Sequence, residues 1–425
     1  EANVAVIFAL SAIPIISFVG VAIDYTRANA ARTSMQAALD STALMLSKDL
    51  STGTINSTQI STKASAYFSA LYHNTDAQSV SVTATYVAPS GSTPAKIQLD
   101  GSGSINTDFM RIAGFPHMDF GTSSTTTWGN VRMRVALVLD VTGSMADDGK
   151  MTALKPAAKS LIDQLSPLAT ANGDIYISIV PFSKDVNMGP SYKDATWIDW
   201  TDWDSKNGYS TCTAWNAKGK CTSSYWTPND HSTWTGCFED RAQNYDTLNT
   251  APTSAVTKFP ADQYSYCDNT GSKIATIMPL SYDWTALKAK IDTLVPTGNT
   301  NQGIGLAWGW MTLTQSDPFN APAKDPNFVY KDALVILSDG LNTQNRWYTD
   351  AASIDARQKI LCDNAKAAGL TIYTVQVNTG SDPTSAVLQY CASNPSNFYL
   401  ITSASQTAAV FNQIGTQLSK LRVSK

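Results

Sequence analysis

An apolar stretch stands at the start of the chain. Residues 4–23 contain no charged side chain, and as a helix they would be long enough to cross a bilayer core of about 30 Å. A cleavable signal peptide is the alternative, because the small residues at 28–30 resemble a cleavage site. The stretch is longer than the about 7 to 15 apolar residues usual in a signal peptide, and no basic segment precedes it. The pattern therefore favours a membrane anchor at 4–23.

Helix-forming residues continue beyond this stretch. Residues 24–50 contain neither Gly nor Pro, and Ala, Met, Leu, Gln and Arg are frequent among them. The pattern predicts one long helix over 1–50, similar to the N-terminal helices of pilins. A stalk helix beside the membrane, without any role in a filament, is the alternative.

A small α+β stalk domain is expected over 51–130. A second helix is predicted at 57–71. Polar and apolar positions alternate at 79–87 and 95–99, which indicates half-buried strands.

Short apolar runs and helical patterns alternate from residue 131 onward. The runs 135–139 and 333–337 are rich in branched apolar residues, which suits buried parallel strands. Helical patterns follow at 151–165, 302–313, 350–368 and 405–421. This order predicts a doubly wound, Rossmann-like α/β domain over 131–425, with helices on both faces of the sheet.

A segment without regular periodicity interrupts this domain at 190–280. Many of the tryptophans of the chain lie in it: Trp197, Trp200, Trp203, Trp215, Trp226 and Trp234. One interpretation is a surface that binds protein or sugar, because aromatic rings beside polar groups make effective contact anchors. The other is the small core of a lobe held together by disulfides. The sequence does not decide between them.

The cysteines all lie downstream of the apolar stretch. They are Cys212, Cys221, Cys237, Cys267, Cys362 and Cys391. Their spacing lacks the paired C-x-x-C motifs of a zinc site, so we expect disulfides in an oxidising compartment rather than reduced thiols. The predicted pairs are Cys212–Cys221, Cys237–Cys267 and Cys362–Cys391, although other connectivities are open.

Charge and motif content exclude several classes of function. Charged residues make up 15% of the 425 residues, against about 25% in a typical soluble protein, which suits an exported protein. A net charge of -4 without a cluster of Lys or Arg argues against a nucleic-acid partner. The histidines are dispersed, and the sequence has no H-E-x-x-H, G-x-S-x-G or P-loop motif. We therefore expect a protein that is not an enzyme.

Oxygen-bearing side chains follow the two predicted buried strands. Asp140, Thr142 and Ser144 come directly after the first, Asp339 follows the second, and Thr300 lies in a loop between them. Open α/β sheets bind ligands at the carboxyl ends of their strands. Two carboxylates and three hydroxyls suit a divalent cation, most simply Mg²⁺, and leave a coordination position for an acidic side chain of a protein partner. Mn²⁺ and Ca²⁺ are alternatives, as is an ordinary turn function for these residues.

This pattern resembles the metal-ion-dependent adhesion site of von Willebrand factor A (vWA) domains. That site has D-x-S-x-S, a later Thr and a later T-D-G turn. Here Thr142 and Ser338 replace the commonest residues, but Thr142 retains a hydroxyl. The resemblance implies that the five predicted ligands hold one ion.

The segments VALVLDVTGSM, LVILSDGLNT and CDNAKAAGLTIYTV, together with the N-terminal helix, resemble the TadG-like family of Flp/Tad pilus-assembly proteins. The resemblance implies a bacterial envelope protein whose vWA domain lies outside the cytoplasm and acts in pilus assembly, as a minor pilin or in adhesion to a host or abiotic surface. The N-terminal helix would contact pilus components. The alternative is a structural anchor or scaffold of the pilus machinery with a vestigial metal site.

Overall fold

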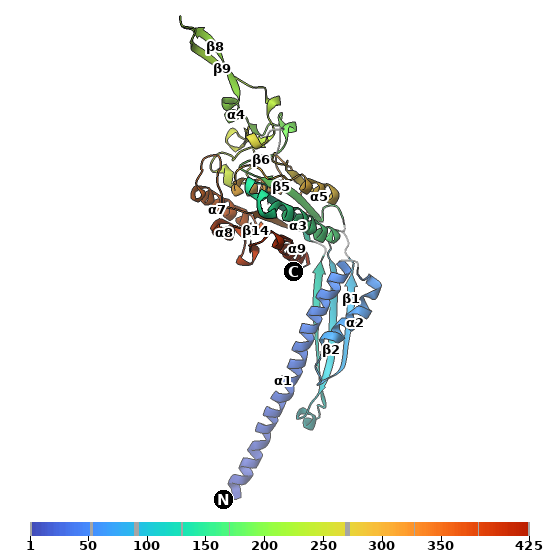
Figure 1. Cartoon of the computed structure of the whole chain (residues 1–425). Coiled ribbons are helices and arrows are strands. Elements are labelled where there is room, and N and C mark those ends of the chain that lie inside the picture. The colour runs from blue at the N-terminus through green and yellow to red at the C-terminus, as the bar shows by residue number, and fades with distance from the viewer. Residues whose placement is uncertain are drawn as a thin grey trace. The chain divides into compact units, whose positions relative to one another are not determined.

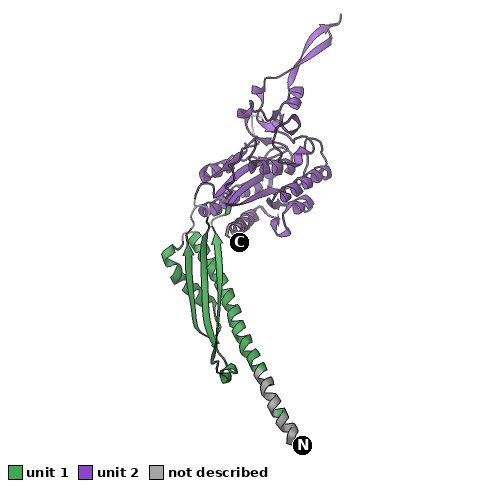
Figure 2. Ribbon diagram, turned by 180° about the vertical axis from the view of Figure 1, so that it is seen from behind, with its two compact units in different colours: residues 1–131, 422–425 green, residues 132–421 purple. Residues whose placement is uncertain are grey.

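The computed structural model describes most of the chain. It covers residues 2–51, 54–88, 93–128, 131–169, 171–267, 273–326, 328–380 and 382–423, with the side chains of 2–7, 9–17 and 420–423 excepted. The chain divides into two compact units, 1–131 with 422–425 and 132–421 (Figure 2). The first unit contains a long helix and an antiparallel sheet, and the second contains a mixed α/β sheet with an inserted lobe.

A single long helix dominates the first unit. Helix α1 (Ala2–Ser51) runs without a break for 50 residues, so the predicted long helix is confirmed over its described residues, 2–50. Among the residues whose side chains are described, no helix is both long and apolar enough to cross a membrane. The predicted anchor at 4–23 falls largely on side chains outside the described set.

An antiparallel sheet packs against α1. Its strands, in the order β1-β2-β3, are β1 (Ala77–Val87), β2 (Ala95–Asn106) and β3 (His117–Trp128). Gly101 lets the helix approach, because a Cβ at this position would lie 2.8 Å from the sulfur of Met35. Helix α2 (Ile60–Leu71) adds Phe68 to the same core. The sequence did not predict β3, because about half of its inward positions are Ser or Thr rather than apolar.

Asp24 is buried on α1 and binds a second segment of the first unit. Its carboxylate accepts hydrogen bonds from the backbone N–H groups of Asp108, Phe109 and Met110, at 3.0, 3.0 and 2.8 Å. These donors stand at the start of the short helix η2 (Met110–Ala113), where N–H groups have no partner within the helix. Asp24 therefore fixes this turn to α1.

The second unit is built on a six-stranded sheet in the order β12-β5-β4-β13-β14-β15. The strands are β4 (Val131–Asp140), β5 (Ile175–Phe182), β12 (Met278–Ser281), β13 (Val329–Ser338), β14 (Thr371–Val377) and β15 (Phe398–Ile401). β4 pairs with β5, β13 with β14, and β14 with β15 in parallel, whereas the edge strand β12 runs antiparallel to β5. The predicted α/β class is confirmed.

Helices cover both faces of this sheet (Figure 1). Successive residues of β4 enter different cores: Val135 and Leu137 contact one, Ala136 and Val138 the other, as expected for a strand buried on both faces. The first core includes α3 (Lys150–Leu165), α5 (Trp284–Asp292) and α9 (Thr407–Val423). The second includes α6 (Gln302–Thr312), α7 (Ala351–Ala367) and α8 (Ala386–Cys391).

The insertion at 190–280 forms a lobe with its own small sheet and an aromatic core. The sheet has the order β6-β10-β11-β7, with β6 (Val186–Asn187), β7 (Ile198–Asp199), β10 (Cys237–Phe238) and β11 (Phe259–Asp262). The ring centre of Trp197 lies 5.4 Å from the ring centre of Phe238 and 5.9 Å from that of Phe259. Helix α4 (Thr201–Lys206) and a separate hairpin, β8 (Gly208–Trp215) with β9 (Cys221–Pro228), complete the lobe.

The tryptophans of the insertion divide between core and surface. Trp197, Trp203 and Trp234 are buried, which favours the alternative of a lobe core for these three. Trp200 is half-buried and stacks on His231 with ring centres 3.7 Å apart. Trp215 and Trp226 are exposed.

The three predicted disulfide pairs are confirmed. Cys212–Cys221 crosses the β8–β9 hairpin, Cys237–Cys267 lies in the lobe, and Cys362–Cys391 joins α7 to α8. Each bond closes a loop and so restricts the unfolded chain.

Candidate metal centre

The loop after β4 places three of the predicted ligands. Asp140 is the last residue of β4 and is fully buried. One carboxylate oxygen accepts a hydrogen bond from the N–H of Thr142 at 2.7 Å, which folds the loop back over the end of the strand. The hydroxyls of Thr142 and Ser144 lie 3.2 Å apart. The alternate spacing thus turns all three side chains to one side.

The loop after β13 brings in the second carboxylate. Because β13 lies beside β4 in the sheet, their carboxyl ends share one edge. Asp339 accepts a hydrogen bond from the hydroxyl of Ser144 at 2.8 Å, and Ser338 donates to the other oxygen of Asp140 at 2.6 Å. Hydrogen bonds therefore connect Asp140, Thr142, Ser144 and Asp339 in one cluster.

Thr300 belongs to a third loop that contacts both of the others through its backbone. The carbonyl of Gly298 accepts from the N–H of Gly143 at 2.9 Å, and Thr300 N–H donates to the hydroxyl of Thr343 at 2.8 Å. Gly298 has a φ of +80°, and a Cβ there would lie in steric conflict with the hydroxyl of Ser183. Thr300 is itself buried, so the third loop is fixed beside the cluster.

The cluster brings two buried carboxylates together, and only Asp339 has a lysine as counter-ion. Burial, and then the charge of Asp339, raise the pKa of Asp140 to about 7, although hydrogen bonds from Ser338 and Thr142 lower it in part. Every donor in the predicted set is an oxygen, the ligand type that Mg²⁺, Mn²⁺ and Ca²⁺ take. The residues present therefore fit a divalent cation.

Lys150 is a neighbour that the sequence analysis missed. Its ammonium donates to Asp339 at 2.8 Å and to the carbonyl of Ser144 at 3.2 Å, and the residue is 9% exposed. It begins α3, where the positive end of the helix dipole disfavours a cation. A lysine at this position needs a nearby carboxylate to compensate. Its place at the start of the predicted helix was therefore the signal that could have identified Lys150.

Buried amides support the three loops. Gln302 donates to the hydroxyl of Ser338 at 3.1 Å and accepts from Gln358 at 3.0 Å, while Asn342 accepts from the N–H of Gln302 at 2.8 Å. Gln358 and Asn342 are also hydrogen-bonded to each other. The network connects the Asp140 cluster to α7. The sequence gave no signal for this network, because its members are single amide residues in helices and loops.

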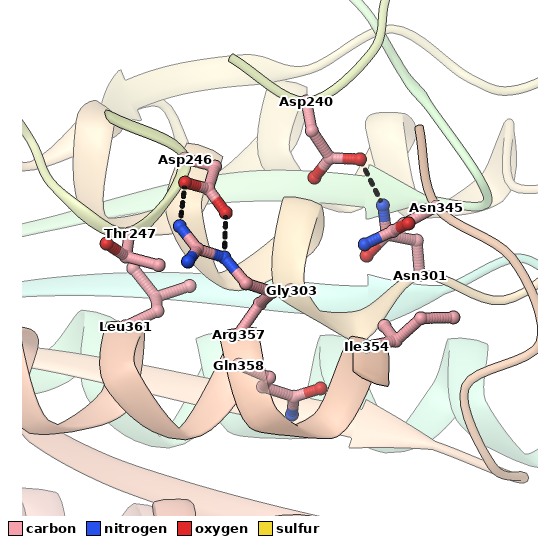
Figure 3. Close-up of a pocket in the computed structure, with 10 residues that line it drawn as sticks. All are labelled: Asp240, Asp246, Thr247, Asn301, Gly303, Asn345, Ile354, Arg357, Gln358 and Leu361. Atoms are coloured by element: carbon pink, nitrogen blue, oxygen red, sulfur yellow. Dashed lines mark hydrogen bonds and ion pairs between the residues drawn. The ribbon is translucent and has the colours of Figure 1, made fainter. Parts of the chain in front are cut away.

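A small pocket between the lobe and helices α6 and α7 adjoins the Thr300 loop (Figure 3). Asn301 donates to Asp240 at 2.9 Å and caps α6 by accepting from Ile304 N–H at 3.2 Å. Burial raises the pKa of Asp240 to about 6, despite the hydrogen bonds that it accepts. Asp246 forms a two-point ion pair with Arg357 in the same view.

One further group of potential ligands in the described chain lies close together: the atoms of Asp185, Cys237 and Cys267 are within 4.8 Å of one another. The two cysteines form a disulfide and so offer no thiolate. The ammonium of Lys184 lies 3.1 Å from Asp185. This group is therefore an ion pair beside a disulfide, and it does not replace the Asp140 cluster as the candidate centre.

The N-terminal segment matches a known family. Residues 2–45 match the family model described as Flp pilus-assembly TadE/G-like, so the resemblance to TadG-like proteins is confirmed for this segment. The search of curated protein sequences found no match.

Several solved structures are remotely similar. The vWF domain of the type V pili tip protein Mfa5 from Porphyromonas gingivalis is 11% identical with a TM-score of 0.40, and the match covers 70% of this chain and 98% of that one. The pilus adhesin SpaC from Lactobacillus rhamnosus GG is 13% identical with a TM-score of 0.40, covering 80% and 35%. Proximal thread matrix protein 1 from the mussel byssus, with a zinc occupied MIDAS motif, is 12% identical with a TM-score of 0.35, covering 68% and 46%.

Proposed function

Starting from the TadE/G-like N-terminal segment, we propose that this chain is a Tad pilus-associated envelope protein whose second unit binds an acidic protein partner through a divalent cation. In this proposal the second unit is a doubly wound vWA domain, and residues 4–23 hold the chain in the membrane or in a filament. The bulk of the chain lies outside the cytoplasm, which agrees with its three disulfides. No catalytic role is proposed.

The observation that carries the proposal is the hydrogen-bonded cluster of Asp140, Thr142, Ser144 and Asp339 at one edge of the sheet. Two buried carboxylates next to each other repel unless a cation or a proton lies between them. A divalent ion would remove that repulsion, with Thr300 as the fifth ligand. If these residues only shaped their own turns, side chains of the loops after β4 and β13 would not need to contact each other.

The ligand set also indicates what the ion would bind. Two carboxylates would balance its charge, while the hydroxyls are neutral and leave the ion able to attract a further anion. When bound, the ion would supply a coordination position for a partner carboxylate, and Mg²⁺ commonly keeps such positions filled with exchangeable water. An acidic side chain at the tip of a partner loop is therefore the proposed ligand.

The experiment is a calorimetric titration of the full chain with Mn²⁺ at pH 8. The wild type is expected to bind one ion, and Asp140→Asn to bind it at least about a hundredfold more weakly, because a charged ligand is replaced by a neutral amide of the same shape. Asp363→Asn, which removes an exposed carboxylate of α7, is the matched control. Circular dichroism checks that each variant is folded. Equal affinity of Asp140→Asn and the wild type would reject the site.

The same titration has a predictable pH dependence. Because the pKa of Asp140 is raised to about 7, protons compete with the ion, and affinity should fall about tenfold for each pH unit well below that value. In the metal-free protein the free energy of unfolding depends on pH in the opposite direction to the affinity for the ion. The folded state holds a proton that the unfolded chain, with an ordinary pKa near 3.8, releases, so the free energy of unfolding falls as the pH rises from about 4 to about 7.

A structural role is the second candidate, and Lys150 favours it. Its ammonium already neutralises Asp339, so the cluster has one internal counter-ion. A scaffold with a vestigial site predicts no binding of Mn²⁺ by the wild type. It also predicts that pilus assembly survives deletion of 132–421 but fails on loss of 4–50.

A further inference from the structure

The β8–β9 hairpin extends away from the rest of the second unit (Figure 1). Within the described chain its two strands pair only with each other. At the base, the indole N–H of Trp226 donates to the carbonyl of Asp204 at 2.7 Å, and Asn229 N–H donates to that of Asn207 at 2.8 Å. No residue of either strand is buried. The hairpin therefore adds almost nothing to a hydrophobic core.

A disulfide keeps this exposed hairpin in one shape. A two-stranded hairpin is at best marginally stable alone in water. The bond between Cys212 and Cys221 lies near its tip and links its strands covalently. A covalent bond that orders a segment without a core points to a role for the surface of that segment.

Large aromatic side chains are concentrated on the hairpin. Tyr209, Trp215, Tyr225 and Trp226 are 58%, 62%, 56% and 43% exposed. In the described part of 132–421, the other large aromatic residues exposed to this degree are Tyr266 and Tyr390. Rings held in water in this way serve as contact groups, because they bring apolar area at a low cost in side-chain entropy.

The pairing of the strands arranges these rings. Tyr209 is opposite Thr227, and Thr211 is opposite Tyr225. Residues opposite each other project from the same face, so both tyrosines share one face with two threonines. Trp226, paired with Ser210, belongs to the other face. Apolar ring faces thus alternate with hydroxyl groups along the hairpin.

The charge of the hairpin is opposite to that of the whole chain. Between 208 and 228 the charged residues are Lys218 and Lys220, both at the tip, and there is no acidic residue. The whole chain has a net charge of -4. The complementary ligand is therefore anionic.

The size of the hairpin argues for a thin ligand. Eight residues per strand at about 3.4 Å each give a face about 27 Å long, and two strands give a width of about 10 Å. Such a narrow strip suits an extended chain better than a folded protein, whose stable interfaces bury roughly 800 Å² on each partner. The hairpin is also open on both faces, unlike the enclosed pockets that bind small molecules.

We propose that the β8–β9 hairpin binds a linear anionic polysaccharide, such as a chain of uronic acids. The tyrosine and tryptophan rings stack on the apolar C–H faces of the sugars, the Ser and Thr hydroxyls hydrogen-bond to sugar hydroxyls, and the two lysines pair with carboxylates. A chain of sugars lies along the face without needing a large contact area. This contact goes beyond the cation-dependent binding proposed above and uses none of its residues.

The test is binding of the full chain to polygalacturonate in EDTA, followed by tryptophan fluorescence and calorimetry. Binding is expected, and Trp215→Ala and Tyr225→Ala should each weaken it about tenfold. The variant Lys218→Gln/Lys220→Gln should weaken it and remove most of its salt dependence. Tyr390→Ala and Lys288→Gln, which change an exposed ring and an exposed lysine elsewhere in the unit, should leave it unchanged.

Two comparison ligands, a neutral polysaccharide and an acidic polypeptide, test whether binding needs both the sugar rings and the carboxylates. Neutral dextran should bind more weakly than polygalacturonate, and poly-L-glutamate should bind weakly and without dependence on Trp215. Equal binding of poly-L-glutamate would overturn the proposal in favour of an acidic protein ligand. Absence of polygalacturonate binding, or its loss in EDTA with recovery on adding Mn²⁺, would also overturn it. The binding expected in EDTA does not depend on whether the Asp140 cluster holds an ion.

Discussion

At the scale of single residues, Lys150 decides how the acidic cluster behaves without a metal. Its ammonium lies 2.8 Å from Asp339, and the carboxylate is buried. The lysine therefore acts as an internal counter-ion. A divalent ion bound to Asp339 would be repelled by this ammonium at close range, so the lysine must move when the ion enters. We therefore expect Lys150 to lower the affinity of the proposed site for the ion without being a ligand.

Replacement of this lysine gives a prediction with two opposite effects. In EDTA, Lys150→Met should lower the free energy of unfolding by about 3 kcal/mol, because a buried carboxylate loses its partner. In Mn²⁺, the variant should bind the ion at least about tenfold more tightly than the wild type, because the competing charge is gone. Thermal unfolding in EDTA and in Mn²⁺ measures both effects.

The control for this prediction is Lys159→Met, which removes a more exposed ion pair of α3 with Asp292. The control should change neither the free energy of unfolding nor the affinity for Mn²⁺ appreciably, since exposed ion pairs contribute about 0 to 1 kcal/mol. Weaker binding of Mn²⁺ by Lys150→Met would mean that the lysine supports the site, contrary to the account of it as a competitor.

At the scale of elements, the Thr300 loop is shaped by its backbone. Gly298 adopts a positive φ next to Ser183, whose hydroxyl donates to the carbonyls of Thr297 and Asn299 at 2.8 and 3.0 Å. Asn301 then begins α6 as its cap. The loop therefore holds Thr300 in place between a strand end and a helix start.

Substitution of Gly298 tests whether this loop belongs to the site. Gly298→Ala is expected to cost about 1 to 3 kcal/mol of stability, from backbone strain and the clash with Ser183, and to weaken Mn²⁺ binding by displacing Thr300. Gly369→Ala is the matched control, because it has a φ of +88° with no atom within 4 Å of the added Cβ.

The control should lose about 1 kcal/mol and keep its affinity for the ion. Equal affinity in Gly298→Ala and the wild type, measured by calorimetry on folded protein, would exclude the Thr300 loop from the proposed site.

At the scale of the whole molecule, the sequence predicted features that depend on local pattern. The apolar run 135–139 and the following Asp140 identified a strand and its loop, and pairing each cysteine with a neighbouring cysteine in the sequence gave the correct pairs. Features that depend on long-range packing were not predictable. The lobe sheet consists of strands as short as two residues, such as β10, which are too short to show a period.

The same reason explains why the sequence did not separate buried from exposed tryptophans. Trp203 and Trp234 lie among polar residues in sequence, and only the folded lobe encloses them. Lys150 and the amides around Gln302 are likewise polar residues that acquire partners more than thirty positions away in the chain, such as Asp339 and Ser338. Sequence pattern identifies the carboxylates of a site more readily than the groups that surround them.

The central claim is that the loops after β4 and β13 hold one divalent ion together with the Thr300 loop. The most direct test is an anomalous difference map from crystals of the full chain grown with Mn²⁺. The account predicts a single strong peak among Asp140, Thr142, Ser144 and Asp339, with the ammonium of Lys150 moved away from Asp339. A map with no peak there at saturating Mn²⁺, and with Lys150 still bound to Asp339, would contradict it.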